Sequence, residues 1–310
     1  MSRKKFVRGA LSLMILGLIA AFLIAPARYA KSVFEGVSLW AVTVLPATFP
    51  FLFLTALFTG TPLFEKLSKK VSPLFMKVFG VSGTGGCAAF LSAVSGYPVG
   101  ARTLLDLKES GRIAPDESFR LACLVTTSGP GFLVGTVGGA MMGRPALGWL
   151  MLLCHFVAVW TVCAGMNLIH KPAKRPPAAL LPVKSGNSLY ESLHSSVISI
   201  LCVGGSIALF YAFGQMIADI LPSSMPPAGE AIVRGLTEMT TGCKLLLTQP
   251  TPFSLGICCF LITFGGACVL FQQLGYLSRA GVKCLPFLLV KLLQALLAGA
   301  LCFGLSCLIF

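Results

Sequence analysis

Two short polar segments inside apolar sequence carry the side chains best suited to chemistry. The first runs from Ser95 to Arg102 and the second from Thr126 to Gly131. Hydroxyls, glycine and proline in such a setting are typical of a helix that stops and then resumes. The resumed helix leaves free backbone N–H groups and the positive end of a helix dipole, which suit a carboxylate or a phosphate. The two segments therefore predict an anion site built on broken helices.

A purely structural interpretation of the same residues stays open. Serine and threonine hydroxyls cap helices, and glycine lets two backbones approach closely. Taken alone, Thr126–Gly131 fits this structural interpretation better. The second break at Ser95–Gly100 and a glycine pair at Gly265 and Gly266 move the balance towards a substrate site.

Nine residues at these breaks are predicted to bind a substrate through hydroxyls, an amide, backbone groups or charge. They are Ser95, Tyr97, Arg102, Thr126, Thr127, Ser128, Gly129, Gly266 and Gln272. An arginine at the start of a membrane helix can pair with an anion or extend to the membrane surface, and for Arg102 both roles stay open. For His155, within a span, a hydrogen bond between helices is favoured over a proton relay.

The sequence predicts no catalytic, cofactor or metal site, so the chain is not expected to be an enzyme. The segment Ala93–Gly96 lacks one glycine of the Gly-x-Ser-Gly nucleophile motif. The twelve Cys are scattered through apolar segments without the spacing to His that zinc sites show. They are interpreted as small residues of a membrane-embedded core.

The elements that must position these residues are membrane helices. Of the 310 residues, 56% are hydrophobic and 11% are charged, which is too little polar surface for a soluble protein of this length. The formal net charge of +14 comes from Lys and Arg in short loops beside apolar spans, so it indicates topology and not nucleic-acid binding. The predicted fold is all-α: a polytopic helical membrane protein.

Hydropathy predicts long spans and two short apolar pieces. The spans are Gly9–Ala25, Gly36–Thr59, about Glu117–Met142, Pro145–Leu168, Leu189–Leu221 and Cys284–Ile309. The short pieces are Thr84–Val94 and Phe253–Gly265, and a helix needs roughly 20 residues to cross a bilayer. We therefore expect both pieces to be re-entrant. We expect the first span to be a retained signal anchor rather than a cleaved signal.

The distribution of basic residues predicts the orientation. With a cytoplasmic N-terminus, sixteen of the 24 Lys and Arg fall in loops at residues 3–8, 66–77, 102–120 and 171–184. This excess favours the cytoplasmic side for those loops. The other eight, which include Arg279, Lys283 and Lys291, are assigned to outside loops or their membrane ends.

The chain is predicted to form a single membrane domain, 1–310, with a basic, proline-rich linker at 170–188 between two repeats. Repeat one covers about 36–142 and repeat two about 189–309. An offset of 170 positions aligns Gly86 with Gly256 and Gly96 with Gly266. The positive-inside orientation makes the repeats inverted, each with a short re-entrant or broken helix, as in many secondary transporters.

Several motifs resemble one protein family. Residues 95–101 (SGYPVGA), 127–138 (TSGPGFLVGTVG), 235–242 (GLTEMTTG) and 264–272 (FGGACVLFQ) resemble the sporulation integral membrane protein YlbJ family, within the nucleoside transporter/FeoB Gate-domain grouping. The resemblance covers roughly Val37 to Phe303. It implies a helical membrane protein of endospore-forming bacteria, in the cell membrane or the outer forespore membrane, and transport of dipicolinic acid during sporulation.

The predicted partners are a small anion, with dipicolinate suspected, and the lipid bilayer, with no nucleic acid. Two carboxylates and an aromatic ring match helix N-termini with hydroxyls and Tyr97. Two alternatives stay open: a nucleoside or nucleobase carrier that uses Gln272 and Glu238, and a non-transporting Gate-type subunit of a larger membrane complex. A homo-oligomer is also compatible with the sequence. Glu238 is expected to cap a helix.

Overall fold

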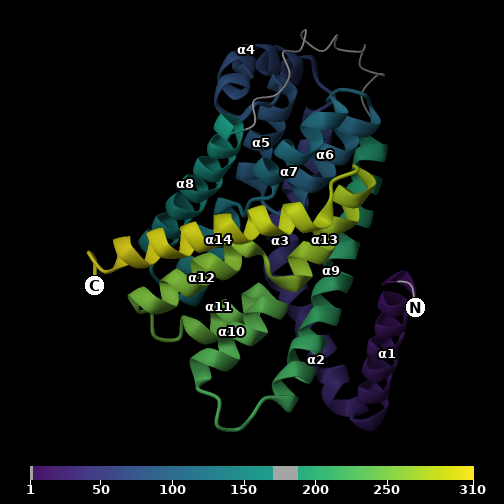
Figure 1. Ribbon diagram of the computed structural model, residues 1–310, viewed down its shortest axis with the longest axis vertical. Helices are drawn as coiled ribbons and strands as arrows, with labels where there is room; N and C mark the ends of the chain where they lie inside the picture. Colours follow the sequence, from purple (N-terminus) through teal and green to yellow (C-terminus); the bar gives the residue numbers. More distant parts are fainter. Residues whose placement is uncertain (1–2, 170–187) are drawn as a thin grey trace.

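The structure is a computed structural model that describes residues 3–169 and 188–310, so most of the predicted linker lies outside the described residues. Within the described ranges all regular elements are helices (Figure 1). Those before residue 170 are α1 (Arg3–Ile24), α2 (Pro26–Leu39), η1 (Trp40–Val44), α3 (Leu45–Phe58), α4 (Pro62–Phe79), α5 (Gly83–Ser95), α6 (Val99–Glu109), η2 (Pro115–Glu117), α7 (Ser118–Val125), η3 (Gly131–Met141) and α8 (Pro145–Ile169).

The helices after residue 187 begin with a long one and continue with two interrupted pairs. They are α9 (Leu189–Ile220), α10 (Pro227–Thr237), α11 (Met239–Leu246), α12 (Pro252–Phe264), α13 (Gly266–Arg279) and α14 (Cys284–Ser306). Ser188 begins α9 with a capping box, in which its hydroxyl accepts from the Glu191 N–H and the Glu191 carboxylate accepts from the Ser188 N–H. Three of the predicted spans, at residues 145–168, 189–221 and 284–309, correspond to α8, α9 and α14.

The helices have the length and composition of membrane spans. Four of the described helical runs are long and apolar enough to cross a bilayer, and up to six are if each sharply bent pair counts as one span. The bent pairs are α1 with α2–η1, at 106°, and α4 with α5, at 87°. The exposed residues of α8 and α14 are largely apolar, as a lipid-facing surface requires: Trp149, Leu153, Val157 and Trp160 on α8, and Leu285, Leu289, Leu293 and Leu296 on α14. The chain is an integral membrane protein.

One predicted span and one predicted re-entrant piece need correction. The segment Glu117–Met142 is not one helix, because α7 ends at Val125 and η3 starts only at Gly131. The piece Phe253–Gly265 forms α12, but α12 and α13 together make a run of 28 residues that is long and apolar enough to cross. The expectation of a re-entrant piece there is therefore not supported, since Gly265 interrupts a longer run. At Thr84–Val94 the short helix α5 is bent sharply against α4, as the re-entrant prediction requires.

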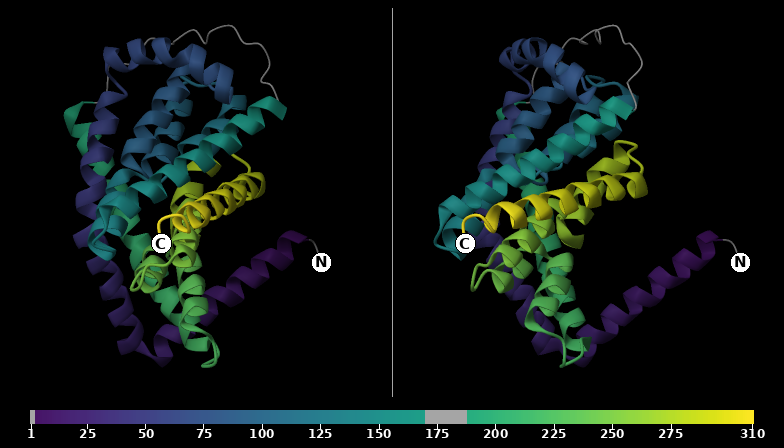
Figure 2. Two further views of the ribbon diagram at one scale, coloured as in Figure 1. Left: turned by 90° about the vertical axis from the view of Figure 1, so that its left-hand side faces the viewer. Right: turned by 60° about the vertical axis from the view of Figure 1, so that its left-hand side comes forward.

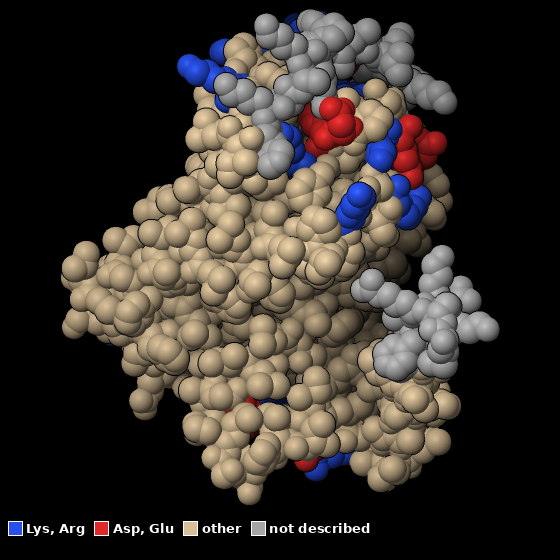
Figure 3. Space-filling view, viewed as in Figure 1, with Lys and Arg blue, Asp and Glu red and all other residues tan. Residues whose placement is uncertain are grey.

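Charged side chains gather at one end of the molecule in the face shown in Figure 3, above a broad uncharged belt. This end carries α4 and the α6–η2 loop (Figure 1). Arg279 lies there too, because its guanidinium is 3.0 Å from the Glu109 carboxylate at the end of α6. The assignment of Arg279 to the outside was therefore wrong: it lies at the same end as the basic loop 102–120.

At this end a buried carboxylate holds the start of α5. The Glu117 Oε1 atom accepts hydrogen bonds from the Ser82 N–H at 2.8 Å and from the Ser82 hydroxyl at 2.7 Å, and Ser82 caps α5. Burial raises the pKa of Glu117, and the bonds from Ser82 lower it in part. The acidic turn therefore positions α5.

The two halves of the chain share their cores. One buried cluster joins residues of α4–α8, such as Leu104 and Leu121, to Leu277 and Phe287 of the second half. A second cluster joins Leu133 and Met151 to α10–α12 and α14. Helix α14 packs against α8 and α12 and contributes residues to both clusters, and Figure 2 shows it lying along α8. The inverted relation of the repeats stays a prediction.

Candidate functional site

The interruptions in the helices pack against each other in pairs, one pair in each half of the chain. Gly96 has a φ of +78°, and a Cβ atom there would lie 2.7 Å from the backbone nitrogen of Gly129. Gly266 has a φ of +60°, and a Cβ atom there would lie 2.9 Å from the carbonyl oxygen of Gly235. Only glycine fits such a backbone conformation and approach. Glycine thus lets two helix interruptions pack together in each half. Residues 96–98 lie against residues 126–130, and residue 265 lies near residues 235–239.

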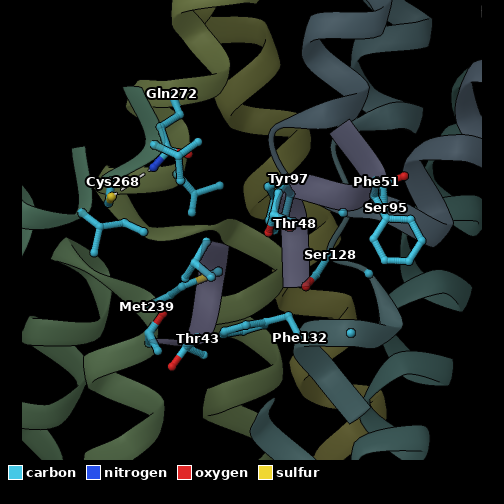
Figure 4. Close-up of a pocket in the computed structure, with 18 of the residues that line it drawn as sticks. Thr43, Thr48, Phe51, Ser95, Tyr97, Ser128, Phe132, Met239, Cys268 and Gln272 are labelled. Carbon is cyan, nitrogen blue, oxygen red and sulfur yellow. Dashed lines mark hydrogen bonds between the residues drawn. The ribbon is translucent and has the colours of Figure 1, made fainter. Parts of the chain in front are cut away.

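One pocket lies where these two pairs of breaks meet. It has about 690 Å³ of space between its atoms, a figure that includes open solvent at its mouth. Its walls come from η1 and α3, the two breaks of the first half, α9, the start of α11, and α13. The polar lining residues are Thr43, Thr48, Ser95, Tyr97, Ser128, Glu238, Thr240 and Gln272, and the larger apolar ones include Phe51, Phe132 and Met239. Figure 4 shows Gln272, Cys268 and Met239 on one side of the pocket and Ser95, Phe51 and Ser128 on the other.

The pocket brings together five of the nine predicted site residues from both halves of the chain: Ser95, Tyr97, Ser128, Gly129 and Gln272. The Gln272 amide donates to the Cys268 sulfur at 3.4 Å, one turn earlier in α13. The broken segments of the two halves therefore share one cavity, a point that the sequence left undecided.

The other four predicted site residues do not line this pocket. Arg102 points to α9, where its guanidinium donates to Ser199 Oγ at 2.9 Å and Ser195 Oγ at 2.6 Å. The Thr126 hydroxyl donates to the carbonyl of Ala122 in its own helix, and Thr127 contacts Ser92 at 3.3 Å. The close contact between Gly266 and Gly235 explains why position 266 is a glycine. For these four residues the contacts favour the structural interpretation.

Behind the pocket, a buried histidine connects breaks from the two halves. His155 of α8 is fully buried, and its Nε2 atom accepts the Ser128 N–H at 3.0 Å. The backbone N–H can only donate, so Nε2 carries no proton and the neutral ring has its proton on Nδ1. Nδ1 then donates to Thr263 Oγ1 at 2.8 Å, near the end of α12. The structure thus shows the predicted hydrogen bond between helices.

Tyr97 forms a second connection between the halves. Its hydroxyl donates to the carbonyl of Ile262 at 2.9 Å, in the last turn of α12. A carbonyl in the last turn of a helix has no partner within that helix, so the phenol satisfies a group that the break at Gly265 frees. Tyr97 therefore stabilises the break at Gly265 through its hydroxyl, and it also lines the pocket.

Two polar residues of α14 satisfy the end of α7. Lys291 Nζ donates to the carbonyl of Thr126 at 2.8 Å, and Gln294 Nε2 donates to that of Cys123 at 3.0 Å. Both side chains are fully buried. The assignment of Lys291 to an outside loop or a membrane end was wrong, since it lies inside α14. A lone lysine in an apolar helix was the sequence signal that could have identified it.

Glu238 caps α11, as expected. Its two carboxylate oxygens accept the N–H groups of Thr240 and Thr241 at 3.0 and 2.8 Å, and the Thr241 hydroxyl donates to Oε2. The positive end of α11 thus offsets the negative charge of Glu238. By contrast, η3 begins at Gly131, beside the pocket, without a side-chain cap. The pocket combines hydroxyls, an amide and the uncapped end of η3.

Comparisons with known proteins add one relative. No known family profile matches the chain, and no solved structure matches it. The sporulation integral membrane protein YlbJ of Bacillus subtilis (strain 168) is 26% identical over 307 aligned positions, which cover 85% of this chain and 74% of that protein. The similarity extends over both halves, and residues 95–101 and 127–138 carry the motifs that resemble the family. At the family level, this similarity supports the YlbJ sporulation integral membrane proteins as relatives of this chain.

Proposed function

We propose that this membrane protein is a transporter or facilitator that moves a small carboxylate across a membrane during sporulation, and that dipicolinate is this carboxylate. The observation that supports the proposal best is the shared pocket, because breaks from both halves of the chain line it. Irregular backbone at membrane depth is tolerated where it is buried in protein or lines a cavity, and transporters bind substrate at such places. The proposal involves no catalytic step and no cofactor.

The chemistry of the lining fits an aromatic dicarboxylate. Ser95 and Ser128 offer hydroxyls, and the uncapped start of η3 at Gly131 offers a positive helix end for a carboxylate. Tyr97 and Phe132 offer rings on which a pyridine ring can pack. These groups come from separate breaks, so substrate binding would hold the breaks together.

A second candidate is a nucleoside or nucleobase carrier. Glu238 and Gln272 line the same pocket, and a carboxylate with an amide can recognise the edge of a base. However, both oxygens of Glu238 already accept N–H groups of α11. We rank this candidate second for that reason.

Counterflow in proteoliposomes tests both candidates. Vesicles that contain only this protein are loaded with unlabelled dipicolinate, with a nucleoside mixture, or with neither, and uptake of labelled dipicolinate or labelled nucleoside is followed. We expect labelled dipicolinate to accumulate only in vesicles loaded with dipicolinate. Exchange of nucleosides alone would favour the second candidate. No exchange by protein that elutes as a single folded species would contradict both, and would favour a subunit that acts with a partner membrane protein.

A further inference from the structure

Lys291 is a cation inside the membrane-embedded part of the molecule. It lies in α14, one of the candidate spans, and none of its surface is exposed. Among the described residues it is the one Lys or Arg in the fully buried set. A charged side chain at membrane depth is costly, so such residues usually have a role in the function.

The contacts of Lys291 place its charge just behind the pocket wall. Nζ donates to the carbonyl of Thr126, two residues before Ser128 of the pocket. It also lies 5.8 Å from the centre of the Tyr97 ring, and Tyr97 lines the pocket. A carbonyl dipole and an aromatic face both stabilise a cation.

No carboxylate neutralises this charge within the described residues. Four ion pairs join Arg28 to Asp219, Arg102 to Asp106, Arg234 to Glu230 and Arg279 to Glu109, and none of these four includes Lys291. Glu238, the carboxylate of the pocket, is bonded to the start of α11 instead. The positive charge of Lys291 is therefore left for a ligand, and its field is little screened in a low-dielectric interior.

We propose that Lys291 is the electrostatic determinant of substrate choice: its charge makes the pocket select anions and favours two carboxylates over one. The inference rests on the proposed function. It adds Lys291 as the residue that determines selectivity and a dependence of affinity on ligand charge. Lys291 acts through the pocket wall, so it sets the potential of the site without contacting the substrate. Affinity should therefore rise with ligand charge, at nearly constant ligand shape.

A structural role for Lys291 makes a different prediction. Lys291 and Gln294 both donate to carbonyls at the end of α7, so Lys291 could serve only as a cap. The neighbouring contact shows that a glutamine amide can make such a bond. Lys291→Gln thus keeps a donor and removes the charge, Lys291→Arg keeps both, and Lys291→Met removes both. Lys108→Gln is a matched control, because Lys108 also donates to a carbonyl, that of Ala280, but lies outside the pocket.

The experiment measures the affinity of each purified variant for three pyridines: dipicolinate, picolinate, and picolinamide, the neutral amide that has the shape of picolinate. Lys291→Gln should weaken picolinate binding about tenfold and dipicolinate binding more, the effect of a unit charge across a low-dielectric wall. Picolinamide binding and the melting temperature should stay unchanged. Lys291→Arg should keep the order of the series, and Lys108→Gln should match the unmodified protein.

Two results would overturn the inference. One is equal loss for charged and neutral ligands in Lys291→Gln. The other is unchanged dipicolinate affinity in Lys291→Gln together with a lower melting temperature in Lys291→Met, as a cap alone requires. If Lys291→Gln does not fold, the affinities of the unmodified protein still test the inference, because equal affinity for all three pyridines contradicts it. Failure of the proposed function has a different signature: the unmodified protein then binds and exchanges no carboxylate at all.

Discussion

At the scale of single residues, hydroxyls in the breaks have two distinct environments. The Thr126 hydroxyl is bonded to its own helix, whereas Ser128, two residues later, lines the pocket. The sequence gives the same prediction for Thr126 and Ser128, because both are small hydroxyl residues in one polar segment. The backbone turn between them decides which hydroxyl is available to a ligand.

Ser128→Ala should weaken dipicolinate binding about tenfold, since a hydrogen bond to a charged acceptor contributes about 1.5 kcal/mol. The measurement is the concentration dependence of counterflow, together with the shift in melting temperature that dipicolinate produces. Ser206→Ala is the control, because it removes a hydroxyl that bonds within α9 to the carbonyl of Cys202. Equal affinity in the two variants would mean that Ser128 does not contact the substrate.

His155→Phe should destabilise the protein by about 2 kcal/mol or more, because it leaves the Ser128 N–H and the Thr263 hydroxyl buried without a partner. His155→Gln offers one acceptor and one donor and should recover part of this loss. Thermal unfolding in detergent measures both variants. If His155→Phe melts at the temperature of the unmodified protein, the histidine does not hold the two breaks together.

At the scale of helices, close glycine contacts determine where the breaks meet. The start of α6 lies next to the start of η3 because Gly96 packs on Gly129. The same device joins the start of α13 to the end of α10 through Gly266 and Gly235. Each half can therefore present two helix interruptions at the pocket.

Gly96→Ala should lower the melting temperature by roughly 5 °C or more, which corresponds to about 2 kcal/mol. The added methyl group meets the Gly129 backbone, which cannot move aside as a flexible side chain would, and the φ of +78° is unfavourable for alanine. Gly135→Ala is the control, because nothing lies within 4 Å of its added methyl group in η3. Comparable melting temperatures for the two variants would contradict the proposed packing of the breaks.

At the scale of the whole molecule, contacts between the halves determine which loops share a side of the membrane. Lys108 donates to the carbonyl of Ala280, and Glu109 pairs with Arg279. The α6–η2 loop and the α13–α14 loop are therefore neighbours at the charged end of the molecule. The α9–α10 loop lies at the opposite end (Figure 1).

Labelling with a membrane-impermeant maleimide tests this arrangement. In a background in which the exposed Cys202, Cys284 and Cys307 are serine, Ser110→Cys and Ser278→Cys should react from the same side of the membrane. Ser224→Cys, in the α9–α10 loop, should react from the other side. Reaction of Ser110→Cys and Ser278→Cys from opposite sides would rule out the contact between these loops.

The class of the protein, the positions of several spans and the presence of breaks at Ser95–Gly100 and Thr126–Gly131 could all be predicted from the amino-acid sequence. Those features are local, because apolar runs, prolines and glycines act on neighbouring backbone. The three-dimensional packing was needed to show which breaks meet, that Ser128 and Gln272 line one pocket while Arg102 lies outside it, and that Lys291 lies buried beside Tyr97. These outcomes depend on contacts between residues that lie in different helices and far apart in the sequence, about which local sequence patterns carry no information.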